Sequence, residues 1–82
     1  MTDHDLRKRA HDLDVTVWVG KKGVASVADE LADQLDDSEL VKVKFLRAAR
    51  GGSSTEELAV ELADLADADI VETRGNTGVF TR

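Results

Sequence analysis

The sequence predicts an α/β fold, an α+β two-layer sandwich with a four-stranded mixed sheet and the element order α-β-α-β-α-β-β. Helix-like spacing of apolar residues alternates along the chain with short stretches of strand-like alternation. Strands that alternate with helices imply crossover connections and therefore partly parallel strands. A glycine-containing turn near the end predicts an antiparallel hairpin. The 82 residues suit one domain, expected to span residues 1–82.

The first half of the chain supplies two helices and two strands. Residues 3–13 begin with a helix-start box and continue with apolar residues at helical spacing, which predicts a helix. Valines alternate with other residues over 15–19, as in a strand, and the glycines of 20–23 end it. Apolar residues at i, i+3, i+4, i+7 and i+11 predict an amphipathic helix over 24–35. Residues 41–46 alternate again and form the second predicted strand.

The second half supplies one helix and the hairpin. Residues 48–54 are expected to be a flexible loop, and a capping box then opens a helix over 54–65. Strands are predicted at 68–74 and 79–81, joined by a turn at 75–78. The first two strands each have one apolar and one partly polar face, so helices should cover mainly one side of the sheet. The pattern leaves open whether the first helix covers part of the other side.

Charge is distributed unevenly along the chain. The net charge of −6, from 17 acidic and 11 basic residues, argues against a polyanionic partner when it is taken as a whole. Residues 24–39 hold six acidic residues and no basic one, whereas residues 40–54 hold four basic residues and no acidic one. Because the Debye length is about 8 Å at physiological salt, a local patch outweighs the distant net charge. The alternative is that the strand lysines only protect a sheet edge.

Composition also excludes several classes of protein. The chain has no cysteine, so it has no disulfide and no thiol nucleophile, and its apolar stretches are too short to cross a membrane. The N-terminus lacks a secretory signal, and we expect a cytoplasmic protein. The acid excess suits a salt-rich cytoplasm, and an ordinary acidic protein is the alternative. His4 and His11 lie about 10 Å apart along a helix, too far to share a metal ion. We therefore expect no metal, no cofactor, no small-molecule substrate and no enzymatic activity.

The Gly20-Lys21-Lys22-Gly23 loop joins a predicted strand to a predicted helix. Glycines allow a tight turn and close approach of a ligand, and the N–H groups at a helix start favour an anion. KH-type domains clamp a nucleic-acid backbone with a Gly-x-x-Gly loop of this kind. A plain tight turn is the alternative, and the loop lacks the spacing of a nucleotide-hydrolysing P-loop.

Four segments in order carry a family resemblance: Leu6-Arg7-Lys8-Arg9-Ala10-His11, Val17 to Val24, Glu39 to Lys44, and Gly75 to Arg82. Together they resemble the CRM (chloroplast RNA splicing and ribosome maturation) domain, or YhbY-like family. The resemblance implies an RNA-binding module with a fold similar to the C-terminal domain of translation initiation factor 3. Stand-alone members are associated with precursors of the large ribosomal subunit. The family's Gly-x-x-Gly loop corresponds to residues 20–23 and its basic strand to Lys42 and Lys44.

The sequence therefore predicts an RNA-binding protein that helps the large ribosomal subunit assemble. The candidate RNA-binding residues are Gly20, Lys21, Lys22, Gly23, Lys42, Lys44, Arg47, Arg50, Arg7, Lys8 and Arg9. The expected partner is ribosomal RNA or a pre-large-subunit particle, bound by a monomer mostly through the RNA backbone. The alternative is a protein–protein adaptor that docks through its acidic helices and does not touch RNA. Trp18 is expected to be buried under the first helix, and stacking on a base is the other possibility.

Overall fold

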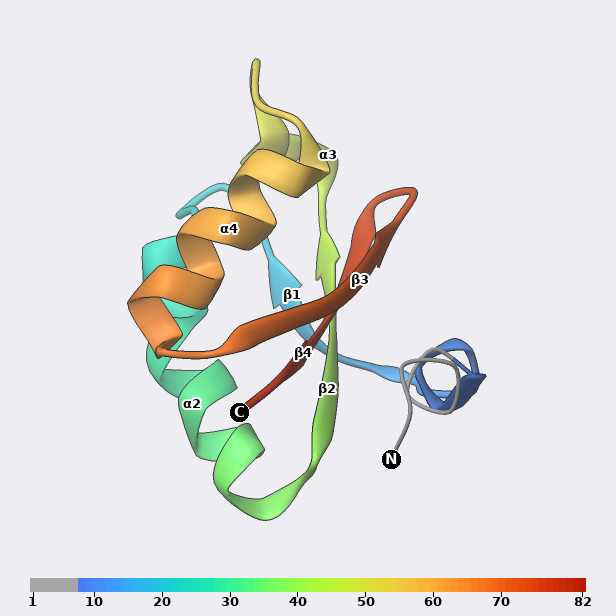
Figure 1. Cartoon of the computed structure of the whole chain (residues 1–82). Coiled ribbons are helices and arrows are strands. Elements are labelled where there is room, and N and C mark those ends of the chain that lie inside the picture. Colours follow the sequence, from blue (N-terminus) through green and yellow to red (C-terminus); the bar gives the residue numbers. More distant parts are fainter. Residues whose placement is uncertain (1–7) are drawn as a thin grey trace.

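Four strands form one mixed sheet in the computed structural model, which describes residues 8–82. The elements are β1 (Val15–Val19), the 3-10 helix η1 (Val24–Val27), α2 (Ala28–Asp37), β2 (Leu40–Phe45), α3 (Arg47–Arg50), α4 (Thr55–Ala66), β3 (Asp69–Arg74) and β4 (Thr77–Thr81). The strand order is β1-β2-β4-β3, with β1 parallel to β2 and the other pairs antiparallel (Figure 1). The predicted α+β class and mixed sheet are confirmed.

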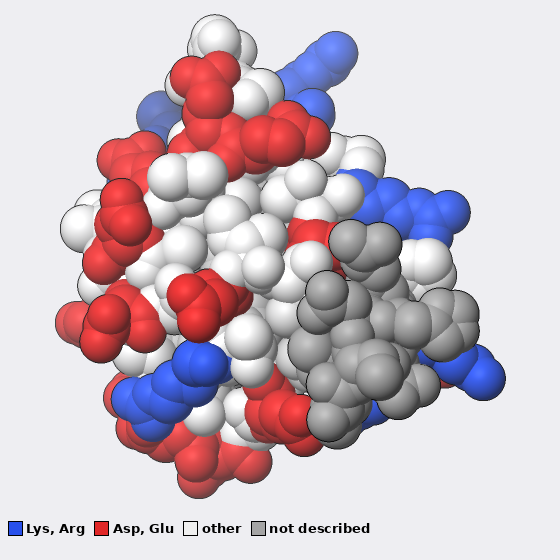
Figure 2. Space-filling view, in the orientation of Figure 1, with Lys and Arg blue, Asp and Glu red and all other residues white. Residues whose placement is uncertain are grey.

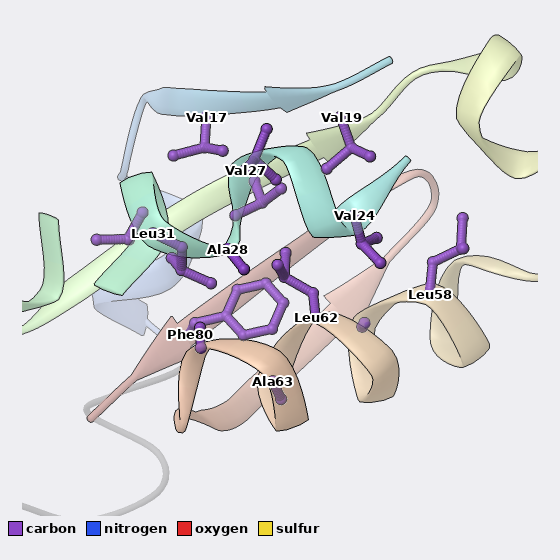
Figure 3. Packing of buried hydrophobic residues seen from close by; sticks show 14 of the residues in the cluster. Val17, Val19, Val24, Val27, Ala28, Leu31, Leu58, Leu62, Ala63 and Phe80 are labelled. Carbon is purple, nitrogen blue, oxygen red and sulfur yellow. The ribbon is translucent and has the colours of Figure 1, made fainter. Parts of the chain in front are cut away.

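The main core lies between one face of the sheet and the helices α2 and α4 (Figure 1). Strand residues that alternate along the sequence, such as Val17, Val43 and Phe80, point into this layer and are fully buried. Leu31 of α2 and Leu62 of α4 meet them from the helix side (Figure 3). The apolar residues that repeat every two positions in the strands and every 3.6 positions in the helices thus form one buried layer.

The predicted capping box opens α4. The backbone N–H of Glu57 donates to the Ser54 hydroxyl at 3.1 Å, and the Ser54 N–H donates to the Glu57 carboxylate at 3.3 Å. Two backbone donors that have no partner within the helix are thereby satisfied.

A second, smaller apolar cluster lies on the opposite face of the sheet, which we call the open face. Residues 8–11 are helical and lie on the other side of the sheet from α2 and α4 (Figure 1). Ala10 packs there against Leu40 and Val79. The sequence left open whether the first helix covers this side, and the structure places its described part over the end where β2 begins. The start box of the predicted helix lies outside the described residues.

Three predicted boundaries were wrong. The helix predicted from Val24 begins as the 3-10 helix η1, in which the Ser26 hydroxyl donates back to the Gly23 carbonyl at 2.8 Å, a local bond that competes with regular helix geometry. The loop predicted over 48–54 contains the short helix α3, because two alanines between two arginines favour a helical turn. The hairpin turn is shorter than predicted, and β4 already begins at Thr77.

The expectation that Trp18 is buried was also wrong, because 53% of its surface is exposed. The cause is the position of the first helix. That helix packs on Leu40, whereas Trp18 pairs with Lys44, four residues or about 13 Å further along β2. The described part of the helix therefore covers the other end of the sheet and leaves the indole uncovered.

Candidate nucleic-acid interface

The Gly20–Gly23 segment forms a tight turn at the end of β1. The Gly23 N–H donates to the Gly20 carbonyl at 3.0 Å, which holds Lys21 and Lys22 at the exposed tip. Gly23 has φ +83° and ψ −179°, a conformation that is essentially restricted to glycine. The second glycine of the motif therefore has a backbone role, since it turns the chain from the strand into η1.

The short helix α3 lies beside this turn. The Leu46 N–H donates to the Val19 carbonyl at 2.9 Å, and a Cβ placed on Gly20 would lie 4.0 Å from Cδ1 of Leu46. Both segments stand at the same end of the sheet (Figure 1). Lys21, Lys22, Arg47 and Arg50 therefore gather at one end of the molecule, which we call the basic end.

Arg50 differs from the other cations of the basic end. Its side chain is partly buried, and its Nε atom has no hydrogen-bond partner among residues 8–82. Because this Nε atom is itself buried from solvent, its unused donor is not accessible from the surface.

One row of residues crosses the open face from edge to edge. Trp18 pairs with Lys44, Lys44 pairs with Thr77, and Thr77 pairs with Arg74. Paired residues on neighbouring strands project to the same face, so all four lie on the open face. This row, the Trp18–Arg74 row, contains an aromatic residue and two cations but no acid.

Lys42 occupies the next row, in which it pairs with Val79, and Val79 pairs with Glu72.

Between the two rows and the first helix lies a shallow pocket of about 230 Å³, lined by His11, Lys42, Glu72, Arg74, Thr77 and Val79. The Nη1 atom of Arg74 lies 3.1 and 3.3 Å from the two ring nitrogens of His11. Glu72, whose side chain is only 17% exposed, lies 3.2 Å from Nε2 of His11. Glu72, the one acidic residue among the described residues that line this pocket, therefore lies beside the imidazole of His11.

The predicted basic residues of the first helix lie apart from the basic end. Arg9 pairs with Glu39 at 3.1 Å, just before β2 begins, and Lys8 is exposed on the preceding position. Arg7 lies outside the described residues. The structure therefore brings together Lys21, Lys22, Arg47 and Arg50 at the basic end. Lys44 lies close to this end because it pairs with Trp18, whereas Lys42 pairs with Val15 at the start of β1. Lys8 and Arg9 lie toward the opposite end of the sheet.

Acidic side chains gather on the helix side of the molecule. The segments α2 and α4 carry nine acidic residues and no basic one. Figure 2 views this side, where acidic groups cover the helices and most basic groups stand at the rim. The negative net charge thus belongs mainly to the outer helix surface and not to the open face.

Within residues 8–82, no group of three or more His, Asp or Glu side chains is placed to hold a metal ion. No helix in the same range is long and apolar enough to span a bilayer.

Comparison with known proteins identifies the family of the chain. The CRS1/YhbY (CRM) domain matches residues 2–82. The chain belongs to the CRM domain family. A Methanocaldococcus jannaschii protein named "Probable RNA-binding protein MJ0652" is similar to this CRM domain, with 41% identity over 71 residues, or 87% of the chain. The chain spans about half of that relative's length, 53%.

A solved structure is similar to this CRM domain throughout. The solution structure of SAV1595 from Staphylococcus aureus, described as a candidate RNA-binding protein, matches with a TM-score of 0.77 and 28% identity. The match covers 98% of this chain and 82% of the other. The resemblance found in the sequence is therefore confirmed for the family and for the fold.

Sequence reasoning missed two members of the open face of this CRM domain. Arg74 lies in the predicted strand 68–74 but is not among the candidate RNA-binding residues, and Thr77 was assigned to a turn. A two-residue turn at Gly75–Asn76 would have paired Arg74 with Thr77 across the hairpin. The pairing of β4 with β2, which adds Lys44 to the row, has no comparable local signal.

Proposed function

We propose that this CRM domain binds RNA through its basic end and open face. The observation that carries the proposal is the gathering of Lys21, Lys22, Arg47 and Arg50 around a tight Gly-x-x-Gly turn. The family and the names of its similar proteins support RNA as the class of partner. The RNA backbone carries one negative charge per nucleotide, so clustered cations supply affinity by releasing counterions.

The turn and the lysines have separate tasks in this proposal. The Gly20–Gly23 backbone carries no Cβ at either end, so a phosphate approaches the main chain closely. Lys21 and Lys22 at the tip neutralise it, and Arg47 and Arg50 extend the contact along α3. Contacts of this type read the shape and backbone of RNA with little reading of bases.

The acidic helices restrict how the RNA is oriented. Nine acidic residues on α2 and α4 repel a polyanion from the helix side. The RNA therefore lies along the basic end and continues over the open face, where Lys42 and Lys44 are available. The same repulsion discourages a second RNA strand from wrapping around the molecule.

We further propose ribosomal RNA as the target and assembly of the large ribosomal subunit as the process. The proposal extends the family resemblance to this chain. In this role the protein acts in the cytoplasm as a monomer, without catalysis and without a cofactor. Crosslinking in cells followed by sequencing of the bound RNA identifies the target, and enrichment of precursor large-subunit RNA is the expected result.

The test compares two variants of equal net charge. Lys21→Gln/Lys22→Gln lowers the net charge by two units at the turn. Arg82→Glu lowers the net charge by the same two units, but beside Asp36 on the acidic side. Binding of each to precursor ribosomal RNA is measured over a salt series. The double variant should bind more weakly, with a salt slope smaller by roughly 1.4 because two phosphate contacts are lost, at about 0.7 per contact on single strands. Arg82→Glu should retain the wild-type slope.

Equal affinities and slopes for the two variants would contradict the role of the turn. If the wild type binds no RNA but retains protein partners after RNase treatment, the adaptor function replaces this proposal.

A further inference from the structure

Trp18 is a large apolar side chain that stands exposed on the open face, whereas Ala10, Leu40 and Val79 on the same face are buried. Its neighbours Val17 and Val19 point into the core and are fully buried, so alternation turns Trp18 to the open face, where 53% of it is exposed. β1 is an edge strand of the sheet, and β2 is its strand neighbour. The indole is therefore accessible from the open face and from the edge.

The surroundings of Trp18 are suited to a nucleotide. Lys44 is its direct cross-strand partner, and Arg74 ends the same row two strands further on. Adjacent strands lie about 4.8 Å apart, which places the ammonium of a flexible lysine within reach of a phosphate attached to a stacked base. An aromatic ring beside cations is the combination that single-strand-binding surfaces use.

The indole also adjoins the proposed phosphate-binding turn. Gly20 follows two residues after Trp18, and a Cβ placed on it would lie 4.0 Å from Cδ1 of Leu46. Leu46 is itself 38% exposed. A partly exposed apolar side chain, that of Leu46, thus lies beside the turn, at the end of β1 that carries Trp18.

We propose that Trp18 stacks on an unpaired base of the bound RNA, while Lys44 contacts the adjoining phosphate. The proposal rests on the RNA-binding function above and adds a preference for single-stranded RNA to it. A paired base is stacked within its helix and presents no free face, whereas a looped-out base does. Stacking requires a π-face and no particular base edge, so the preference is for unpaired RNA of any sequence.

The experiment uses the single tryptophan as a reporter, because the chain has no other tryptophan and no tyrosine. The wild-type protein is titrated with a single-stranded oligouridylate and with an RNA duplex of equal length. The single strand should quench the indole emission, and the duplex should bind without comparable quenching. Trp18→Ala should weaken single-strand binding roughly 5- to 150-fold, the loss typical of one stacked base. Trp18→Phe, which keeps a ring, should lose less than Trp18→Leu.

Salt separates stacking from charge. The loss caused by Trp18→Ala should remain when salt is raised, whereas the loss caused by Lys21→Gln/Lys22→Gln should shrink. Circular dichroism checks that each variant is folded. If Trp18→Ala binds the single strand as tightly as wild type while the lysine variant does not, the stacking proposal is overturned and RNA binding at the turn stands. If the wild type binds neither RNA, both proposals fail.

Discussion

Lys44 of β2 and Arg74 of β3 lie in one row of the sheet, because each is the direct cross-strand neighbour of Thr77. They are 30 residues apart in the sequence, and only the strand order β1-β2-β4-β3 brings them together. The arrangement extends positive charge from the basic end across the open face. It also places Arg74 on the open face, although Arg74 follows an acidic segment in the sequence.

The first prediction concerns this pair. Lys44→Gln and Arg74→Gln should each weaken RNA binding and reduce the salt slope by roughly 0.7, because each removes one phosphate contact. A filter-binding salt series measures both effects. Arg82→Gln, which removes one charge beside Asp36, is the control and should leave the slope unchanged. A slope unchanged in Arg74→Gln would exclude Arg74 from the interface.

The second prediction concerns the turn itself. Gly23→Ala should lower the free energy of unfolding by about 1–3 kcal/mol, because φ +83° with ψ −179° is strained for any residue with a Cβ. The cost is conformational, since no atom outside the adjoining residues lies within 4 Å of the added Cβ. Gly52→Ala is the matched control, with equally open surroundings and no positive φ, and should change stability by less than about 1 kcal/mol. Urea unfolding of both variants measures the difference, and equal stabilities would contradict the turn geometry.

The third prediction concerns the acidic helices. Asp33 lies four residues from both Asp29 and Asp37 on α2, and Glu57 and Glu61 repeat this spacing on α4. Like charges at this spacing destabilise a helix by about 0.2–0.5 kcal/mol per pair at low salt. Raising KCl should therefore stabilise the fold by about 1 kcal/mol while it weakens RNA binding.

Asp33→Asn tests this explanation, because it removes both repulsive pairs of α2 together. Its gain in stability with salt should be clearly smaller than that of wild type, whereas Asp69→Asn on β3 should behave as wild type. Thermal unfolding over the KCl series provides the measurement. The explanation does not hold if salt leaves the wild-type midpoint unchanged.

The fourth prediction concerns the capping box of α4. Ser54→Ala should destabilise the protein by about 1 kcal/mol, because the Glu57 N–H loses its acceptor. Ser53→Ala changes a hydroxyl outside the capping box and serves as the control. Chemical unfolding compares the two, and equal stabilities would show that water replaces the cap without cost.

The elements that local chemistry specifies were predicted from the sequence. The capping box at Ser54, the apolar stripe of α2 and the alternation in β1 and β2 each involve residues close together in the chain. Their backbone conformations depend on neighbours within a few positions, so the pattern is visible without tertiary structure.

How the helices and strands pack against one another could not be predicted from local sequence patterns. The exposure of Trp18 depends on where the first helix packs, and the position of Arg74 depends on how β4 pairs with β2. Register shifts near Val15 and after Ile70 also change which residues face each other. Such features depend on contacts between distant segments, and propensity or periodicity carries little information about them.

The central claim is that RNA binds the basic end and open face and avoids the acidic helices. Amide and indole NMR shifts of the full chain, followed during titration with a single-stranded RNA, test it most directly. The account predicts shifts at Trp18, Gly20–Gly23, Lys44 and Arg74, with the amides of α2 and α4 unchanged. Shifts confined to α2 and α4 would contradict it.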